Sequence, residues 1–356
     1  MSDTNLENSR INKRNENKKK KRKKRYLYIL LPTLIIILTI ASYGIHLYTK
    51  AQSTVEDSYT DVGRENETSE LREEAVDPVE DNVSVLIIGV DDSEKRDYNG
   101  HGRSDTLILA TFNKKKGNVK LLSIPRDSYV YVPEVDYFTK INHAHAYGGP
   151  KASIETVENF LNVPVDYFVR VNFEAFIEVV DSLGGIEYDV PFEMSEMDSK
   201  DNKNAIHLMP GNQELNGEEA LALARTRKYD NDIERGKRQQ EIIKTVVKEA
   251  ASASSILKLG DLIEAVGDNM TTNLSFDEMK SFMSYGINNN FSITSINLEG
   301  SGGKMNDGLW YYQVDEQSRA EIENELREQL DLPITNELDS KYTSEDISEE
   351  KNTTIN

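Results

Sequence analysis

The sequence predicts an α/β fold, with a mixed sheet sandwiched between helices, after one N-terminal transmembrane helix. Between residues 83 and 250, short apolar runs of strand length alternate with amphipathic helical patterns. This alternation is typical of a sheet that helices cover on both faces. Ahead of it, residues 26–48 form an uncharged run rich in Leu and Ile. With 37% hydrophobic residues, the chain can still form a core of ordinary size.

The apolar run at residues 26–48 predicts a transmembrane helix, because about 20 apolar residues span a hydrocarbon core of roughly 30 Å. Tyrosines lie near both of its ends, where aromatic rings prefer the membrane interface. A cleaved signal peptide is the alternative, but its apolar region is typically about 7–15 residues long and precedes a small-residue cleavage site. We therefore interpret the run as an uncleaved signal anchor.

The charge of the chain is divided unequally between its parts. The whole sequence has 42 Lys+Arg against 62 Asp+Glu, but residues 1–25 hold eleven bases against three acids. This basic segment abuts the apolar run, so the positive-inside rule assigns it to the cytoplasm and residues 49–356 to the outside. We expect a single-pass type II protein of the cell membrane, with membrane lipid as a contact of the basic segment. The acidic remainder argues against nucleic acid as a partner.

The composition predicts five segments along the chain. They are a cytoplasmic basic segment (1–25), a transmembrane helix (26–48), an acidic extracellular stalk (49–82), one folded domain (83–335) and an acidic, disordered tail (336–356). The stalk and the tail have too few apolar residues to fold by themselves. Cysteine is absent, which excludes disulfides, thiol nucleophiles and cysteine-based metal sites.

The domain begins with strand-like runs. Val83–Val90 is apolar and rich in β-branched residues, which favours a buried strand. Thr106–Phe112 and Val119–Ile124 are two further strand-like runs, and the polar segment between them is typical of a hairpin turn. Tyr167–Val171 and Ile186–Val190 are shorter runs of the same kind.

Helical patterns alternate with the later strands. Four segments carry apolar residues at helical spacing, namely Ser153–Leu161, Phe173–Leu183, Gly217–Ala224 and Ile233–Ala250. Asn216 is the expected N-cap of the third segment, with Glu219 in capping-box position. The glycine pairs at 148–149 and 184–185 are most simply helix stops.

Arginines, aspartates and one glutamine recur at the predicted ends of these elements, where loops converge. These residues are Asp91, Asp92, Arg103, Asp105, Arg126, Asp127, Arg225, Arg227, Asp232, Arg235, Arg238 and Gln239. Asp232, Arg235 and Gln239 are three and four residues apart, so they share one face of their helix. Arg225 and Arg227 cannot both face that way on a continuous helix. The chain must therefore turn between them or just after them.

Such a set of side chains suits a pyrophosphate or polyphosphate site. Guanidinium groups hold phosphate oxygens bidentately. A pair of carboxylates can hold Mg²⁺, which keeps several waters and bridges phosphates. The alternative is that each Arg–Asp pair is only a structural salt bridge. The recurrence of the pattern at five element ends favours a shared site.

Other catalytic or metal sites have weaker support. His143 and His145 would share a face in a strand but diverge on a helix, and neither a cysteine nor a third histidine is close in sequence. A zinc site is therefore not expected. Ser104 and Ser123 have no convincing histidine partner, which argues against a serine-hydrolase triad.

Six segments with a recognisable pattern occur in order along the chain, namely VLIIGVDDS, HGRSDTLILATF, VKLLSIPRDSYVYVP, KINHAHAYGG, VNFEAFIEVVDSLGGIEYDV and MPGNQELNGEEALALARTRKYDNDIERGKRQQEII. Together they closely resemble the LytR-CpsA-Psr family of Gram-positive bacteria. The resemblance runs from about residue 83 to 250, with a less distinctive continuation to about 330. The anchor and its topology are also similar to the family.

The resemblance implies an extracytoplasmic phosphotransferase. Such an enzyme moves a glycopolymer, for example wall teichoic acid, from a polyprenyl-pyrophosphate carrier to the C6 hydroxyl of N-acetylmuramic acid in peptidoglycan. A phosphodiester forms and polyprenyl phosphate is released. In-line phosphoryl transfer requires charge neutralisation and alignment, and this agrees with the arginines and carboxylates noted above.

The family motifs also imply roles for individual residues. Asp91 and Asp105 are the expected ligands of Mg²⁺, or of Mn²⁺, and one of them assists deprotonation of the acceptor. The implied catalytic residues are Asp91, Asp105, Arg126 and Arg225. The implied pyrophosphate clamp comprises Arg103, Arg126, Arg225, Arg227, Asp232, Arg235 and Gln239. Asp92 leaves the first metal ligand open, and Arg238 could take the place of Arg235.

The lipid carrier requires an apolar cavity, and two helix faces are candidates for its lining. They carry Phe173, Phe176, Ile177 and Val180, or Leu221 and Ile242, although the same stripes equally fit a plain core. Two other functions remain open. A lipid-pyrophosphate hydrolase would use the same clamp, and a non-catalytic wall-polymer binding or regulatory protein would keep the arginines without needing the metal carboxylates.

Overall fold

The computed structural model describes residues 42–46, 48–64, 68–91, 102–229, 232–250, 267, 269–287 and 292–334. The chain divides into two compact units, Met1–Gln52 and Ser53–Asn356. In the first unit, residues 42–46 and 48–52 are helical. Within the described ranges, no helix has both the length and the apolar composition needed to cross a membrane. Most of the predicted anchor, and the basic segment and tail, lie outside the described residues.

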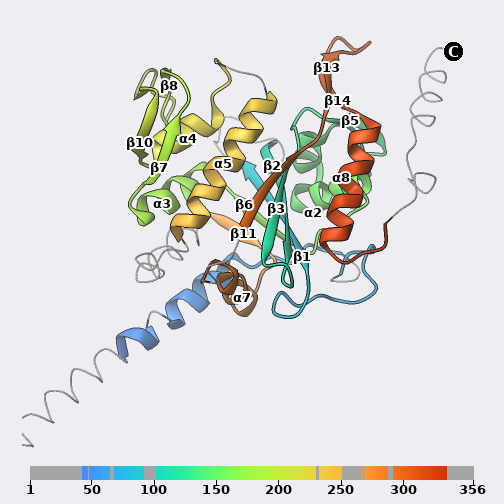
Figure 1. The fold of residues 1–356 in the computed structure, drawn as a ribbon, viewed down its shortest axis with the longest axis horizontal. Helices are drawn as coiled ribbons and strands as arrows, with labels where there is room; N and C mark the ends of the chain where they lie inside the picture. Colours follow the sequence, from blue (N-terminus) through green and yellow to red (C-terminus); the bar gives the residue numbers. More distant parts are fainter. Residues whose placement is uncertain are drawn as a thin grey trace, which may run out of the picture. The chain divides into compact units, whose positions relative to one another are not determined.

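The second unit contains a six-stranded sheet in the order β11-β6-β1-β2-β3-β12, which runs through the centre of Figure 1. Its strands are β1 (Val83–Val90), β2 (Ser104–Asn113), β3 (Asn118–Ser123), β6 (Tyr167–Val171), β11 (Met270–Thr272) and β12 (Ser292–Asn297). β1, β2 and β3 are antiparallel neighbours, β6 is parallel to β1, and β12 is parallel to β3. The predicted mixed sheet is therefore confirmed.

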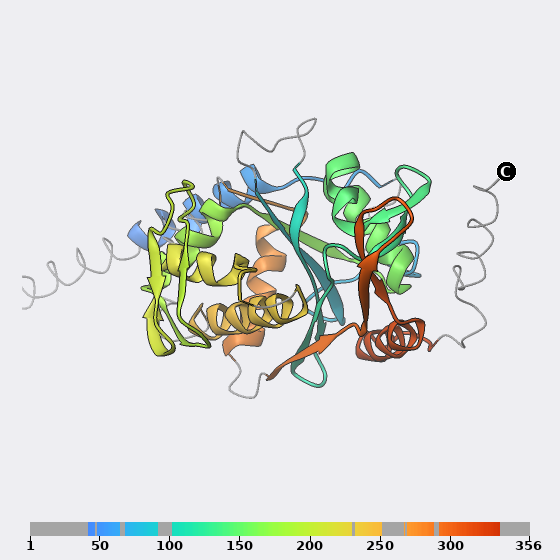
Figure 2. The ribbon, with the colours of Figure 1, turned by 90° about the horizontal axis from the view of Figure 1, so that it is seen from above.

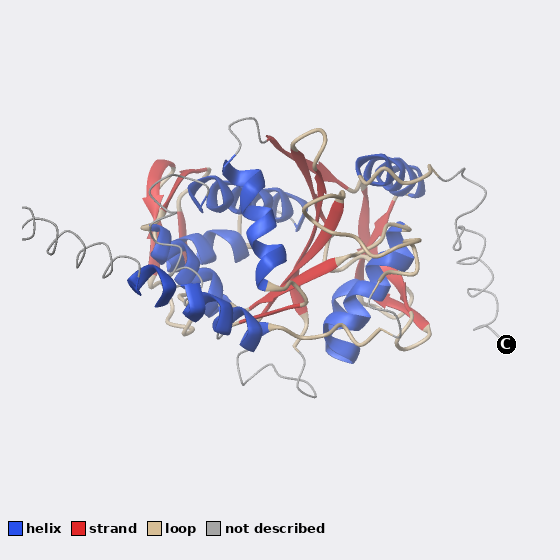
Figure 3. Ribbon diagram, turned by 90° about the horizontal axis from the view of Figure 1, so that it is seen from below, coloured by secondary structure: helices blue, strands red, loops and turns tan. Residues whose placement is uncertain are grey.

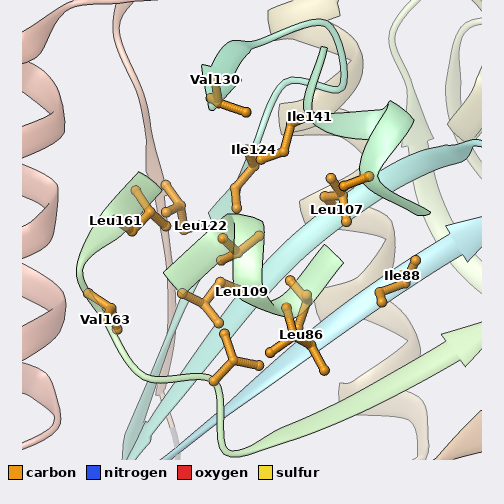
Figure 4. Close-up of a cluster of buried hydrophobic side chains, with 14 of the residues drawn as sticks. Leu86, Ile88, Leu107, Leu109, Leu122, Ile124, Val130, Ile141, Leu161 and Val163 are labelled. Carbon is orange, nitrogen blue, oxygen red and sulfur yellow. The ribbon is translucent and has the colours of Figure 1, made fainter. Parts of the chain in front are cut away.

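Apolar side chains alternate between the two faces of this sheet, as strand geometry requires. The main core cluster takes its strand residues from one face, among them Leu86, Ile88, Leu107, Leu109 and Leu122 (Figure 4). The intervening residues form a second cluster on the other face, with Ile108, Ala110, Val119 and Leu121. Both faces are thus apolar, and each needs a cover.

Helices supply that cover on both sides (Figures 2 and 3). The helices are α2 (Ile141–Leu161), α3 (Phe173–Leu183), α4 (Gly217–Arg225), α5 (Asp232–Ala250), α7 (Phe276–Ile287) and α8 (Glu316–Gln329). α2 and α8 cover the first face, where Ile154 and Leu326 join the main cluster. α5 covers the other face, where Ile243 packs against the second cluster. The side-chain amide of Gln240 on α5 also donates hydrogen bonds to carbonyls of β3 and β12.

α3, α4 and part of α5 form a lobe with its own core. Two small antiparallel sheets complete it, namely β7 (Ile186–Val190) with β10 (Gly211–Leu215) and β8 (Met194–Glu196) with β9 (Ile206–Leu208). Its core is separate from the clusters on the large sheet and includes Val180, Ile186, Leu215 and Ile242. The lobe therefore packs beside the sheet through α5 and keeps its own apolar interior.

Local capping explains the bounds of α3 and α4. The Asn172 side chain accepts a hydrogen bond from the Ala175 amide at 2.9 Å, and Gly184 ends α3 with φ 95°. The predicted capping box of α4 is present, since Asn216 and Glu219 bind each other's backbone amides. These helices lie within one residue of their predicted positions because the signals that define them are local.

α2 differs from the prediction, because it begins at Ile141, well before Ser153. Gly148 and Gly149 have non-helical backbone angles, so they bend the helix where the sequence suggested a stop. Pro150 begins the second part of α2, at a position where a missing amide donor costs little. The residues before the bend pack under the β4–β5 hairpin, which consists of Tyr129–Val132 and Tyr137–Lys140.

A second hairpin, β13 (Gly300–Lys304) with β14 (Trp310–Val314), stands beside the first. The Tyr129 and Tyr311 rings meet edge to face with centroids 5.0 Å apart. Contacts of this kind connect the C-terminal part of the domain with the loop that follows β3.

Part of the segment 49–82 packs on the domain. Arg64 lies 3.0 Å from a Glu158 carboxylate oxygen. Arg72 binds Asp166 through Nε and Nη2 at 2.9 and 2.6 Å, and the Ser84 amide donates to the same carboxylate at 2.8 Å. Both side chains of the Arg72–Asp166 pair are almost fully buried. The ordered domain surface therefore includes residues that precede β1.

Candidate active site

The carboxyl ends of β1, β3, β6 and β12 and the start of β2 lie at one edge of the large sheet. This follows from the strand directions, because β6 and β12 run parallel to β1 and β3, while β2 runs opposite to its neighbours. Ligands of open α/β sheets commonly bind outside the carboxyl ends of strands. Loops at this edge carry much of the predicted site.

Asp91 and Asp105 stand on adjacent strands at this edge. Asp91 directly follows β1, whose last residue, Val90, pairs with Ser104, the neighbour of Asp105. The register shifts between Gly89 and Val90, and such bulges are frequent beside active sites. Asp91 is 9% exposed, whereas the Asp105 side chain is 35% exposed. The two carboxylates thus approach the edge from neighbouring strands.

Arg126, in the loop after β3, forms an ion pair with Asp105. Its buried Nε donates no hydrogen bond within the described part of the chain and lies 3.7 Å from Asp127 Oδ2. Asp127 also binds Lys140 Nζ at 2.8 Å, and its carbonyl accepts a hydrogen bond from the Tyr312 amide at 2.9 Å. β5 and β14 therefore hold Asp127, which keeps the Arg126 guanidinium at the edge.

Arg103 belongs to the same group and is exposed. The pKa of His143 is lowered to about 4, first because the ring is partly buried and then because the charges of Arg103 and Lys140 are close. His143 Nδ1 lies 2.9 Å from Thr139 Oγ1. His143 is therefore neutral near pH 7 and does not repel the neighbouring cations.

The first turns of α5 approach the edge from the opposite face of the sheet. A Cβ atom at Gly236 would lie 2.7 Å from Ser123 Oγ, so α5 runs very close to the end of β3. This contact brings Arg235, which is 5% exposed, near the loop that holds Arg126. Gln239 donates to the Ala224 carbonyl at 3.1 Å and so connects α5 to the end of α4.

Arg225 is the last residue of α4. Its guanidinium lies over the Phe173 ring, 5.2 Å from the centroid, and donates to the Asp198 carbonyl at 3.2 Å. Phe173 begins α3 directly after β6, so this arginine also reaches the sheet edge. Thr226 has an extended backbone, with φ −61° and ψ 140°. The predicted turn between Arg225 and Arg227 is therefore confirmed.

Arg238 is buried and binds the backbone at the end of α4. Its Nε donates to the Leu223 carbonyl at 2.7 Å, and its Nη2 donates to the Thr226 carbonyl at 2.8 Å. Its guanidinium also lies 5.5 Å from the Phe192 ring centroid. These contacts give Arg238 a role in holding α4, which distinguishes it from Arg235.

The remaining predicted residues are Arg227, Asp92 and Asp232. Arg227 is exposed beyond the end of α4. Asp92 and the side chain of Asp232 lie outside the described residues. The structure therefore pairs Asp105 with Arg126 on one side of the strand ends. On the other side it places Arg225 at the end of α4, where α4 contacts α5.

The two histidines considered for zinc lie on the first part of α2 and have separate contacts. His145 is fully buried, and its Nδ1 lies 2.7 Å from the Gly102 carbonyl. His143 instead contacts Thr139. Their spacing on a helix separates the two rings, as expected for residues two positions apart.

Sequence reasoning missed Lys140 and the second contact of Phe173. Lys140 ends β5 immediately before the segment INHAHAYGG, and this strand–helix junction was the only local signal of its position. Phe173 was expected to contact lipid, but its ring also supports Arg225. Cation–π contacts of this kind fix a guanidinium without neutralising it.

These features define a class of protein. It has an α/β fold whose strand-end site combines fixed arginines with carboxylates and is suited to a phosphate-bearing anion. The LytR_cpsA_psr family matches residues 45–328. The chain belongs to this family.

Its relatives include named transferases. The chain is 39% identical over 299 residues to the polyisoprenyl-teichoic acid–peptidoglycan teichoic acid transferase TagU of Bacillus licheniformis, with coverage of 83% of this chain and 92% of that protein. The structure of TagT bound to LIIa-WTA has a TM-score of 0.66 and 36% identity, over 77% of this chain and all of that one. The structure of TagT with bound octaprenyl pyrophosphate lipid has a TM-score of 0.60 and 34% identity, over 75% of this chain and 98% of that one.

Proposed function

We propose that the protein transfers a glycopolymer, such as a teichoic acid, from a polyprenyl-pyrophosphate carrier to peptidoglycan. The acceptor is the C6 hydroxyl of a muramic acid residue, and the product is a phosphodiester. The observation that carries this proposal is the group of Arg103, Asp105 and Arg126 at the sheet edge, opposite the start of α5. The names of related proteins as teichoic acid transferases, and the lipid pyrophosphate bound by TagT, support the same chemistry.

The proposed reaction is a single in-line displacement. The acceptor oxygen forms a bond with the phosphorus that carries the glycan, and the bond from this phosphorus to the bridging oxygen of the lipid phosphate breaks. The hydroxyl proton passes to Asp91 or Asp105 and then to solvent, and polyprenyl phosphate leaves. Arg126 and Arg225 neutralise the charge that develops on the phosphate oxygens, which is the main requirement of such a transfer.

The clamp arginines differ in how firmly they are held before substrate binds. Arg225 is fixed by Phe173 and the Asp198 carbonyl, and Arg126 is fixed by two aspartates. Arg235 is buried beside the end of β3. Preorganised donors avoid the cost of reorientation during the reaction. Arg103 and Arg227 are exposed and complete the proposed clamp on its solvent side.

The carboxylates Asp91 and Asp105 fit a site for Mg²⁺, or for Mn²⁺. The two residues lie at adjoining ends of paired strands, and hard cations of this kind prefer oxygen ligands. No group of three or more acidic or histidine side chains suited to a metal occurs in the described part of the chain. Mg²⁺ needs only one or two carboxylates together with phosphate oxygens and waters. When bound, the ion would supply further neutralisation of the pyrophosphate.

The lipid chain of the donor is proposed to lie on the α3 side of the sheet. Val180, Leu221 and Ile242 are buried, and Val180 and Ile242 belong to the packed core of the lobe. Phe173 and Phe176 are only partly buried. Since Phe176 also packs against that core, Phe173 at the start of α3 is the better candidate for lipid contact.

The location of the reaction is part of the proposal. The sequence predicts an anchor at residues 26–48 with a basic cytoplasmic flank, so we propose that the domain lies outside the cell membrane as part of a single-pass type II protein. Both the lipid-linked donor and peptidoglycan would then be accessible to the same domain.

The test incubates the full-length protein in detergent with a lipid-linked pyrophosphoryl glycan, Mg²⁺ and peptidoglycan oligomers. Glycan joined to peptidoglycan supports the proposal. Free glycan phosphate would identify a hydrolase instead, and donor binding without any product would identify a binding protein. Omission of Mg²⁺ and addition of a chelator should abolish transfer.

The site variants for this assay are Arg126→Ala and Asp105→Ala. Each should lower the transfer rate by about 100-fold or more, because loss of one preorganised charge at a transition state has effects of this order. Lys120→Ala is the matched control, since Lys120 lies on β3 and its side chain has the same 21% exposure as Arg126. Transfer by either site variant at the rate of the control would count against the site.

A further inference from the structure

Two tyrosines form a pair beside the candidate active site. Tyr137 begins β5 and Tyr147 lies on α2 just before its bend, and their hydroxyl oxygens are 2.8 Å apart. Their rings meet nearly edge to face, with centroids 6.3 Å apart. Each of the two residues is 42% exposed. The pair therefore presents two aromatic rings and two hydroxyls to solvent in a fixed arrangement.

The fold holds this pair in place through the bend of α2. Gly148 and Gly149 leave the helical conformation directly after Tyr147, so Tyr147 ends the first part of the helix. A Cβ atom at Gly148 would lie 3.0 Å from the Glu134 side chain, which shows how closely the β4–β5 turn approaches the bend. The sequence segment HAYGGP thus fixes the position of an exposed tyrosine as well as the direction of the helix.

The tyrosine pair lies beside His143, which is under the influence of the Arg103 charge. The His143 and Tyr147 rings lie 6.1 Å apart. The pKa of Tyr147 is raised to about 12, first by burial of part of the phenol and then by the hydrogen bond with Tyr137, while the charge of Arg103 opposes this rise. The same arginine also lowers the pKa of His143. The charge of Arg103 therefore acts on both His143 and Tyr147.

Such a pair has the chemistry of a saccharide contact. One face of a pyranose ring is lined by C–H groups, and its edge carries hydroxyls. An aromatic side chain with a polar tip matches both features, because the ring packs against the apolar face and the phenol bonds to the edge. The raised pKa keeps the Tyr147 phenol protonated near pH 7, and a phenol hydroxyl can donate as well as accept hydrogen bonds.

The in-line geometry of transfer assigns this contact to the acceptor. The lipid phosphate is the leaving group, and its proposed path lies on the α3 side of the sheet. The attacking oxygen must approach from the opposite side, because attacking and leaving oxygens are aligned in phosphoryl transfer. The β4–β5 hairpin and α2, which carry the two tyrosines, are on that side (Figures 1 and 2).

We propose that Tyr137 and Tyr147 form a binding surface for a sugar ring of the peptidoglycan acceptor, next to the muramic acid whose hydroxyl attacks. This inference rests on the proposed transferase function. In the reaction itself the surface forms and breaks no bond, and it contributes by holding the acceptor in line with the phosphorus. The donor glycan has similar sugar chemistry, so the experiment must distinguish the two sources.

The experiment measures transfer kinetics of the full-length protein with the concentrations of donor and acceptor varied separately. The variants are Tyr137→Ala, Tyr147→Ala and Tyr147→Phe. We expect the alanine variants to raise the KM for peptidoglycan oligomers about tenfold, with a smaller increase for Tyr147→Phe, which keeps the ring. The KM for donor and the kcat at saturating acceptor should change little. Tyr59→Ala is the control, because Tyr59 is 48% exposed and lies outside the site.

A binding measurement without donor makes the inference independent of turnover. The probe is a tetrasaccharide of alternating N-acetylglucosamine and N-acetylmuramic acid, followed by saturation-transfer NMR. The wild-type protein should bind it, and the Tyr137→Ala/Tyr147→Ala double variant should bind it about tenfold more weakly. Equal binding by both proteins would overturn the proposal.

The possible failures can be told apart. If transfer proceeds but the variants keep the wild-type KM for acceptor, the tyrosine surface is wrong and the proposed function stands. An increase in the KM for donor alone would also overturn the proposal, because the surface would then hold the donor glycan. If the wild-type protein transfers nothing, but the tetrasaccharide binding depends on the tyrosines, the transferase function fails and the saccharide contact stands.

Discussion

Replacement of Arg238 by Met tests how the end of α4 is held in place. Arg238 is 5% exposed, and it donates to the carbonyls of Leu223 and Thr226 at 2.7 and 2.8 Å. Hydrogen bonds from charged donors contribute about 1.5–3 kcal/mol each. Removal of the guanidinium also relieves part of the cost of its burial. We therefore expect the free energy of unfolding to fall by about 3 kcal/mol, near the lower end of the sum for two bonds.

The assay is urea-induced unfolding of the full-length protein in a mild detergent, followed by far-ultraviolet circular dichroism. Lys237→Met is the matched control, because Lys237 is the neighbouring cation on α5 but is half exposed and pairs with Glu234 at the surface. Such a pair contributes about 0–1 kcal/mol. Arg225 is the last residue of α4, the helix whose end Arg238 holds. The transfer rate per folded molecule should therefore also fall for Arg238→Met.

The result that would refute this reasoning is a loss of stability for Arg238→Met no larger than that of Lys237→Met. A large loss of stability with an unchanged transfer rate would refute only the second part, that Arg238 positions Arg225.

Three other perturbations have defined outcomes. Arg72→Met should lower the free energy of unfolding by about 3–5 kcal/mol, because it leaves the buried Asp166 charge without its partner; urea unfolding measures it. Gly217→Ala should be destabilising by about 2 kcal/mol or more, since the new Cβ would lie 2.3 Å from the Ile177 carbonyl oxygen, and thermal unfolding measures it. The pKa of His143 is lowered from 6.5 to about 4, so the unfolded state binds a proton that the folded state does not, and stability should fall as pH drops through this window. His143→Gln should reduce that slope in urea unfolding across the same pH range.

Each of these three predictions would be contradicted by a specific result. Lys115→Met removes an exposed partner of Asp331 and should leave the free energy of unfolding almost unchanged; an equally small effect of Arg72→Met would contradict the role of burial. Unchanged stability of Gly217→Ala would mean that α3 and α4 can separate without cost. A His143→Gln protein with the wild-type pH slope would assign that slope to other groups.

The sequence predicts well those elements whose bounds depend on neighbouring residues. β1 is a mainly apolar run, and α3 has an Asn cap and a glycine stop, so both agree with their predicted ranges. The alternation of such elements was also sufficient to predict a sheet between helices. These signals act within a few residues of the chain, where propensity and capping decide the structure.

The rest depends on contacts between distant segments. The first part of α2 has few apolar periodic positions, and its helix is held by packing under the β4–β5 hairpin. Lys140 belongs to the site because Asp127 lies next to it in space, which no spacing in the sequence indicates. The role of Arg238 also required the structure, because it shares the first turns of α5 with Arg235 and nothing in the sequence indicates that its guanidinium donates to carbonyls at the end of α4.

The pairing of β12 with β3 leaves one edge of β3 unpaired during synthesis of the chain. β3 has β2 on one side and only β12 on the other, and β12 comes after α7, late in the domain. During synthesis the earlier segments emerge first, so the outer edge of β3 stays open until almost the whole domain exists. An open edge strand can pair with another copy of the chain. A product truncated before Ser292 is therefore expected to aggregate, whereas in the complete protein a short strand rich in Ser, Thr and Asn covers this edge.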